Sequence, residues 1–267
     1  MFRGLAVVLV ALISVPALAA RPLVSVIIDD MGNQMREGER ALALPGAVTY
    51  AFLPLLPATP PLARRAHRLG KEVMLHQPME AVGREPLGPG GIVLHMTHAQ
   101  FRRKMEANLA SVPFVAGVNN HMGSMITRHP GHMTWLMKLL KRHGNLYFVD
   151  SRTTARTVAE QMAHEQRVPV VRRDVFLDDD LHPGAIRHQF HRLVAIARRQ
   201  GHAVAIGHPH PQTLKVLSRL LPQLAGQGIE LVPVSAMIES VRPKGTMLWQ
   251  ASLSSSQKAV KRPKPSP

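Results

Sequence analysis

The stretch Leu-Val-Ser-Val-Ile-Ile-Asp-Asp, residues 23–30, places an apolar run directly before two carboxylates. Short runs of valine, isoleucine and leucine are typical of strands that are buried in a parallel sheet. Because the carboxyl ends of parallel strands open on one face, the polar residues that follow such strands are expected to meet there. Five further apolar runs end in the same way, at polar signatures that begin with His76, Asn119, Asp150, Asp178 and Gly207.

Strand-like runs alternate with helix-like stretches from Leu23 to about Ile238. The expected strands are 24–28, 48–53, 72–75, 115–118, 146–149, 168–171 or 175–177, 204–206 and 230–232. The expected helices are 60–69, 98–109, 133–143, 154–165, 185–200 and 212–226. This alternation predicts an α/β fold, a (β/α) barrel that is distorted or incomplete, with seven to eight mostly parallel strands ringed by helices.

The composition limits the classes of function. The chain has 267 residues, 45% of them hydrophobic, which suffices for one domain with a large core. A net charge of +16 indicates an anionic neighbour. The absence of cysteine excludes disulfides, thiolate metal sites and a cysteine nucleophile. With 4% aromatic residues the chain lacks stacking platforms, so a nucleic-acid partner is not expected.

The two ends differ from the body of the chain. Residues 1–20 resemble a signal peptide, with Arg3, a short apolar run and a small-x-small site at 17–19; an uncleaved anchor is the alternative. Residues 21–241 then form the domain, with no stable membrane span after cleavage, in a periplasmic or secreted protein. The basic tail 242–267, rich in Ser, Lys and Pro, is expected to be disordered, either merely solvated or tethered to an anionic envelope polymer.

Asp29 and Asp30 are adjacent carboxylates that repel each other. A nearby cation relieves that repulsion, or one of them carries a proton; alternatively, one simply caps a helix that begins near Met31. His76 and Glu80 are four residues apart, so on a helical turn they face the same way and both suit zinc. The alternative is a surface histidine and a solvated glutamate.

The order of four motifs resembles that of the divergent polysaccharide deacetylases, over about residues 23–238. These motifs are Ile-Asp-Asp-Met-Gly at 28–32, His-Gln-Pro-Met-Glu at 76–80, Asn-Asn-His-Met-Gly-Ser at 119–124 and Gly-His-Pro-His at 207–210. The position of the wider family's second metal histidine is Glu80 here. That departure motivates an alternative in which the chain is a catalytically silent carbohydrate-binding or envelope-scaffold protein on the same fold.

The resemblance implies metal-dependent removal of N-acetyl or O-acetyl groups from an envelope polysaccharide such as peptidoglycan. Asp30 and His76 would hold the divalent metal, zinc by default, with His121 or Glu80 as the third ligand. Asp29 would act as base and His208 as acid.

The remaining candidates would bind substrate or orient other groups. Gly123 and Ser124 would offer backbone N–H groups to an oxyanion, unless this segment is only an Asn/Gly turn. Asp150 and Arg152 would orient a catalytic group or bind sugar hydroxyls, or else the segment caps a helix through Ser151 or Thr153. One member of the run Asp178 to Asp180 could face the site, but all three cannot do so from a strand. His210 is a second candidate for the acid.

Overall fold

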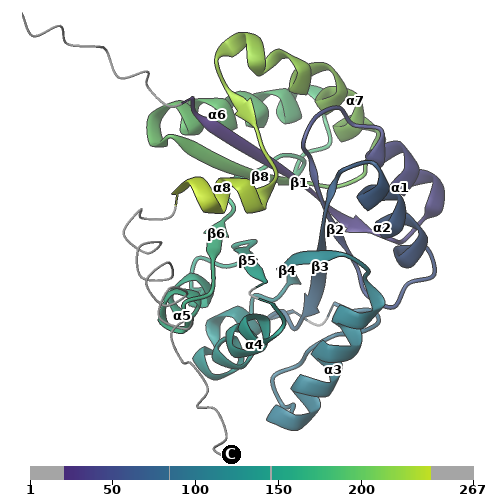
Figure 1. Ribbon diagram of the computed structural model, residues 1–267, viewed down its shortest axis with the longest axis vertical. Coiled ribbons are helices and arrows are strands. Elements are labelled where there is room, and N and C mark those ends of the chain that lie inside the picture. Colours follow the sequence, from purple (N-terminus) through teal and green to yellow (C-terminus); the bar gives the residue numbers. More distant parts are fainter. Residues whose placement is uncertain (1–20, 84, 145, 242–267) are drawn as a thin grey trace, which may run out of the picture.

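The structure is a computed structural model that describes residues 21–83, 85–144 and 146–241. The predicted signal peptide, 1–20, and the predicted tail, 242–267, lie outside the described residues. The described part forms one parallel sheet with helices around it (Figure 1).

All strand pairs of the described sheet are parallel, and the strands run in the order β6-β5-β4-β3-β2-β1-β8-β7, with β9 beside the start of β1. This order follows the chain around an incomplete ring, so the predicted distorted or incomplete (β/α) barrel is confirmed. The strands are β1 Leu23–Met31, β2 Thr49–Phe52, β3 Glu72–Met79, β4 Val115–Met122, β5 Tyr147–Asp150, β6 Val170–Arg172, β7 Val175–Phe176, β8 His202–Gly207 and β9 Glu230–Leu231.

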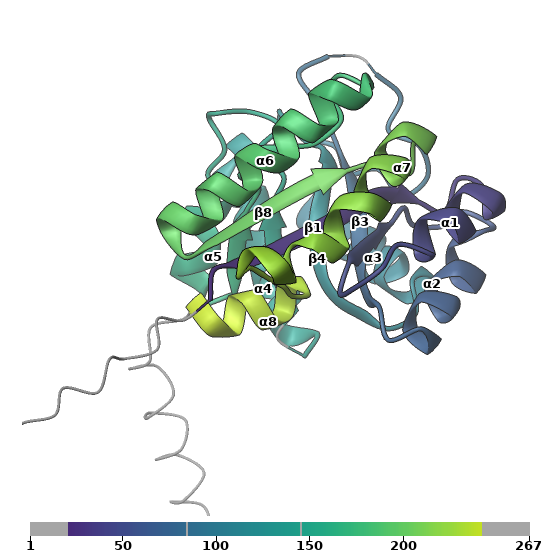
Figure 2. The same ribbon diagram turned by 90° about the horizontal axis from the view of Figure 1, so that it is seen from above.

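Helices surround the sheet, and α6 and α7 lie along β8 (Figure 2). None of the helices among the described residues is both long and apolar enough to cross a membrane. Two helices of eight residues each, α1 and α8, were not among the predicted helices. The α-helices are α1 Met35–Leu42, α2 Thr59–Arg68, α3 His98–Ser111, α4 Pro130–Arg142, α5 Ala159–Gln166, α6 Pro183–Gln200, α7 Pro211–Leu220 and α8 Val234–Val241, and short 3-10 turns are η1 Ile126–Arg128, η2 Leu221–Gln223 and η3 Ala225–Gln227.

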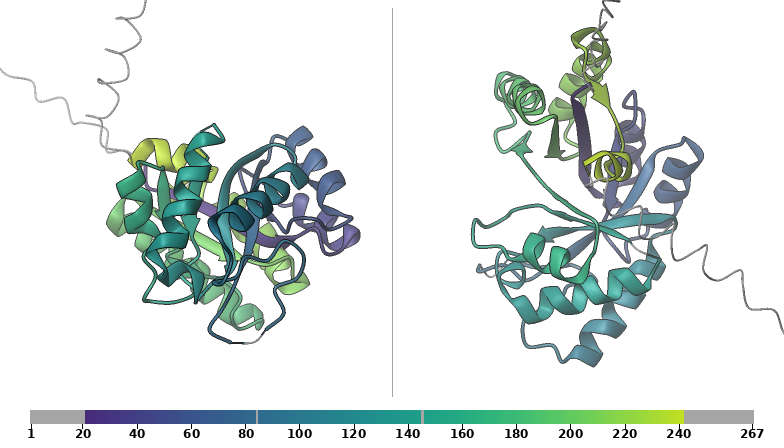
Figure 3. Two further views of the ribbon diagram at one scale, coloured as in Figure 1. Left: turned by 90° about the horizontal axis from the view of Figure 1, so that it is seen from below. Right: turned by 60° about the vertical axis from the view of Figure 1, so that its left-hand side comes forward.

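The ring is interrupted between β6 and β7, which are consecutive in the chain but do not pair. At this point the Arg173 N–H donates to the Asp150 carbonyl oxygen of β5, whereas the Asp174 N–H donates to Val204 of β8. One extended segment thus leaves one edge of the sheet and joins the other (Figure 3). The two alternatives that the sequence offered for this strand, 168–171 and 175–177, therefore both contain strand residues.

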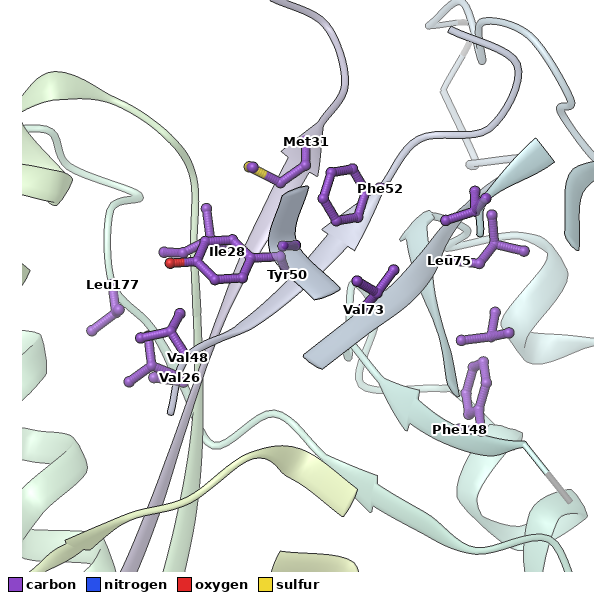
Figure 4. Packing of buried hydrophobic residues seen from close by; sticks show 14 of the residues in the cluster. Val26, Ile28, Met31, Val48, Tyr50, Phe52, Val73, Leu75, Phe148 and Leu177 are labelled. Atoms are coloured by element: carbon purple, nitrogen blue, oxygen red, sulfur yellow. The ribbon is translucent and has the colours of Figure 1, made fainter. Parts of the chain in front are cut away.

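The larger core lies between the sheet and the helices. Val26, Ile28, Tyr50, Phe52 and Leu75 are fully buried there (Figure 4). These positions alternate along their strands with residues that face the inside of the barrel, as the pleat of a strand requires. The sheet is therefore covered by apolar side chains on its outer face.

A second, smaller core fills the inside of the barrel, where Ile27, Met74 and Val204 pack against Met237 and Ile238 of α8. This arrangement places α8 at the end where the strands begin (Figure 1). The next inward position after Ile27 on β1 is Asp29, and the next after Met74 on β3 is His76. The inside of the barrel therefore changes from apolar to polar toward the carboxyl ends of the strands.

Glu72 connects α8 to the beginning of the sheet. Its carboxylate accepts hydrogen bonds from Thr49 Oγ1 and Tyr147 Oη, each at 2.9 Å. It also accepts from the Ser235 N–H in the first turn of α8 at 3.3 Å. The buried hydroxyl groups of Thr49 and Tyr147 are thus paired with a carboxylate at this end of the barrel.

Candidate metal centre

The two adjacent aspartates both reach the inside of the barrel because β1 is irregular at this point. The register between β1 and β2 shifts between Ile28 and Met31, and Asp30 has a left-handed backbone with φ = +55°. A regular strand would point neighbouring side chains to opposite faces, and a bulge removes that restriction. Neither aspartate caps a helix, since α1 begins only at Met35 after the N-cap residue Gln34.

Three potential metal ligands converge next to this bulge. Asp30 Oδ1 lies 3.3 Å from His76 Nε2 and 3.1 Å from His121 Nδ1, and the two ring nitrogens are 3.1 Å apart. Asp30 Oδ1 is buried and has no hydrogen-bond partner among the described residues. One carboxylate oxygen and two imidazole nitrogens that meet in this way fit zinc or a similar divalent cation.

Asn119 of β4 determines which nitrogen of His76 is available. Its side-chain N–H donates to Asp29 Oδ1 at 2.8 Å, so its oxygen faces His76 Nδ1, also at 2.8 Å. His76 must then carry its proton on Nδ1, and its Nε2 keeps a free lone pair directed at Asp30 and His121. Asn119, Asp29 and His76 are buried, so water does not compete for these hydrogen bonds.

The two aspartates have opposite electrostatic surroundings. Burial raises the pKa of Asp29, which is 2% exposed, above its ordinary value, although His76, His208 and Asn119 act against it. Burial also disfavours the charge of Asp30, but the neighbouring imidazoles His121 and His76 outweigh it and lower the pKa of that carboxyl. Asp30 is therefore the permanent anion, and Asp29 is the better proton acceptor.

His208 lies on the other side of this cluster, directly after β8. Its Nε2 is 3.9 Å from Asp30 Oδ2, and its Nδ1 is 3.0 Å from Asp178 Oδ1. Asp178 Oδ2 accepts from the His208 main-chain N–H and from Thr213 Oγ1, each at 2.7 Å. Burial opposes protonation of His208, but the hydrogen bond and charge of Asp178 outweigh it and raise the pKa of His208 to about 9.

The side chains of Glu80 and Ser124 both contact the loop that follows β3. The Glu80 carboxylate accepts a 2.6 Å hydrogen bond from the Leu94 N–H and is not part of the convergent ligand group. Ser124 Oγ accepts a 2.9 Å bond from the Val82 N–H. Both side chains thus hold the loop that follows β3. The third potential metal ligand beside Asp30 and His76 is His121.

The segment after β5 forms its own network. Asp150 accepts from the Arg152 N–H and from Thr157 Oγ1, each at 2.9 Å, so its carboxylate fixes the turn rather than a ligand. Arg152 itself has a left-handed backbone with φ = +49°. In the acidic run, which follows the end of β7, Asp178 is 5% exposed while Asp179 and Asp180 are exposed, so only Asp178 lies inside the molecule.

Asn119 and Asn120 belong to the motif at 119–124, but the sequence predicted no role for either. Asn119 bridges Asp29 and His76, whereas the Asn120 side chain accepts from the Ser151 N–H and donates to the Met122 carbonyl oxygen. One signal was present, because Asn119 precedes His121 by two residues and so points to the same face of the strand. Thr213 gave no such signal, since its contact with Asp178 depends on how α7 packs.

The chain is similar in sequence and in fold to known proteins. The sequence model of a family described as divergent polysaccharide deacetylase matches residues 26–238. The uncharacterized protein YibQ of Escherichia coli K12 is 38% identical over 226 residues, which cover 85% of this chain and 70% of YibQ. An uncharacterized protein of Haemophilus influenzae is 36% identical over 215 residues, 78% of this chain and 76% of the relative. The crystal structure of the uncharacterized protein ATU2773 from Agrobacterium tumefaciens C58 has a TM-score of 0.78 at 24% identity, covering 83% of this chain and 91% of ATU2773, and it shares the fold.

Proposed function

Because this chain belongs to the divergent polysaccharide deacetylase family, we propose that it is a metal-dependent hydrolase that removes acetyl groups from an envelope polysaccharide. The single observation that carries the proposal is the convergence of Asp30, His76 and His121 beside one buried carboxylate, Asp29, and one imidazole, His208. A metal site with a base on one side and an acid on the other is what amide or ester hydrolysis requires.

Asp30, His76 and His121 would hold the cation, and zinc is the ion that this donor set suits best. When bound there, the cation would polarise the acetyl carbonyl group and make a water molecule more acidic. Asn119 supports this arrangement because it fixes the ring of His76 with Nε2 toward Asp30 and His121, the other residues that would hold the cation.

Asp29 is the proposed base. Its raised pKa makes it a better proton acceptor than an ordinary carboxylate, and Oδ1 is engaged with Asn119. Oδ2 lies 3.6 Å from His76 Nε2, next to the proposed metal ligands. It would accept a proton from the attacking water, whose oxygen forms the new bond to the acetyl carbon.

His208 is the proposed acid. Asp178 holds its Nδ1, so Nε2 points toward Asp30 and the reacting groups. The pKa of about 9 keeps the ring protonated at neutral pH. His208 would donate the Nε2 proton to the sugar nitrogen as the carbon–nitrogen bond breaks, and acetate would leave with the new oxygen. In an ester the same proton would go to the leaving sugar oxygen.

The proposal includes a periplasmic or secreted location, supported by the leader-like residues 1–20. Acetylated envelope polysaccharide is then the substrate that the protein would meet.

Metal content and acetate release test the function together. The full chain is treated with a chelator, reloaded with zinc, and incubated with N-acetylated chitooligomers and with peptidoglycan. Acetate release is expected from the reloaded protein, with losses of at least about 100-fold for Asp29→Asn and for chelated protein. Bound zinc without acetate from any substrate would support the silent carbohydrate-binding alternative, and full activity after chelation would exclude the metal mechanism.

A further inference from the structure

A second group of metal-ligating side chains lies around the turn from β8 to α7. Asp178, His208 and His210 each offer one ligand atom, and these atoms lie within 4.8 Å of one another. None of the three belongs to the group of Asp30, His76 and His121, so the two groups share no ligand.

The carboxylate of this second group is held in a fixed orientation. Asp178 is buried, and both of its carboxylate oxygens have partners. Because Thr213 Oγ1 and the His208 main-chain N–H both donate to Oδ2, Oδ1 is left to face His208 Nδ1 at 3.0 Å. An oxygen and a nitrogen at that separation can bind one cation between them.

The third donor, His210, is exposed and is not engaged in capping. It is the N-cap residue of α7, but its side chain makes no hydrogen bond to that helix. Pro209 and Pro211 restrict the backbone on either side of it. Its ring centroid lies 5.8 Å from that of His208, so the imidazole is already beside the Asp178–His208 pair.

We propose that Asp178, His208 and His210 form a second, separate site for a divalent cation of the zinc class. One carboxylate oxygen and two imidazole nitrogens supply three ligands, and solvent completes the shell on the side of His210. A cation at this site would take the place of the proton on His208 Nδ1, and that proton would pass to solvent.

The site has a consequence that rests on the proposed function. His208 would act as an acid only while both ring nitrogens carry protons. With a cation on Nδ1 the ring would keep its Nε2 proton far more firmly than an imidazolium does, so it would not protonate the leaving group. Excess zinc is therefore expected to inhibit the deacetylase that a first zinc ion activates.

Counting bound zinc tests the second site without any substrate. The full chain and its variants are dialysed against buffers of rising free zinc concentration, and the zinc bound per chain is measured by elemental analysis. Wild type is expected to bind a second ion at higher free zinc than the first. His210→Ala should lose the second ion, or bind it at least about tenfold more weakly, and should keep the first. Asp30→Ala should show the opposite pattern.

His188→Ala is the matched control, because His188 is an exposed histidine on α6 outside both groups. It should bind zinc as wild type does. The proposal is overturned if wild type binds a single ion over the whole range, or if His210→Ala and His188→Ala bind equally. Acetate assays at the same zinc concentrations report separately on the enzyme: a chain that binds two ions but releases no acetate contradicts the proposed function and leaves this site intact.

Discussion

Replacement of Asn119 should weaken metal binding although Asn119 is not a ligand. Asn119→Leu keeps a similar volume but removes both of its 2.8 Å hydrogen bonds, to His76 Nδ1 and Asp29 Oδ1. His76 is then free to place its proton on Nε2 and to rotate away from Asp30. Loss of such an orienting partner typically costs 10–100-fold in metal affinity, which corresponds to about 1.4–2.8 kcal/mol.

The same substitution should also reduce stability. It leaves two buried polar groups without partners, each of which costs about 1–3 kcal/mol, so the free energy of unfolding should fall by about 2–6 kcal/mol. Some of that loss overlaps with the loss of metal binding, and urea denaturation is therefore measured with chelator present. Zinc affinity is measured on the folded variant by competition with a chromophoric chelator.

Two further variants separate the roles of Asn119. Asn119→Asp keeps an oxygen for His76 Nδ1 but loses the donor to Asp29 and adds a like charge. The pKa of Asp29 should rise further, so the low-pH limb of kcat/KM should move to higher pH while zinc binding is largely retained. Asn120→Ala is the matched control, since its contacts are with Ser151 and Met122, and its zinc affinity should change less than about threefold. A folded Asn119→Leu protein that binds zinc as tightly as wild type would refute the reasoning.

Three other changes test separate parts of the molecule. Asp178→Asn removes the group that raises the pKa of His208, so His208 should lose its proton at lower pH, and the high-pH limb of kcat/KM should move toward neutrality. Glu72→Ala strips partners from buried polar groups at the opposite end of the barrel and should lower the free energy of unfolding by about 2–4 kcal/mol in urea, with unchanged zinc affinity. In chelated protein Asp30→Gly should be more stable than Asp30→Ala by about 1 kcal/mol, because only glycine adopts φ = +55° without strain; equal stabilities would contradict the strained backbone.

The sequence predicted the parts of this site that depend on strand ends. Asp29, His76 and His208 each follow an apolar run, and parallel strands necessarily bring such residues to one rim. The barrel could likewise be predicted, because the segments between successive apolar runs are long enough for a helix that connects two parallel strands. These inferences need only periodicity and topology.

The sequence could not predict which side chains contact one another within the site. His121 and Glu80 were both candidates for the third ligand from the sequence, since both ligand types suit zinc. The loop after β3 turns the Glu80 carboxylate to the Leu94 N–H, and that depends on how the loop folds back on β3. The pairing of Asp178 with His208 likewise joins residues 30 positions apart, through two loops of unknown path.

The backbone becomes irregular at the carboxyl ends of the strands, so the regular alternation of side chains along a strand does not continue there. Asp30, Met122 and Arg152 have left-handed conformations, with φ of +55°, +53° and +49°. Asp30 and Met122 lie at the ends of β1 and β4, which carry Asp29, Asp30 and His121, and Arg152 lies just after β5. For residues with a side chain this conformation costs about 1–2 kcal/mol. Glycine would remove the cost, but at position 30 it would also remove a proposed ligand. The left-handed turn at Asp30 lets two neighbouring aspartates share the inside of the barrel, one as a proposed metal ligand and the other as the proposed base.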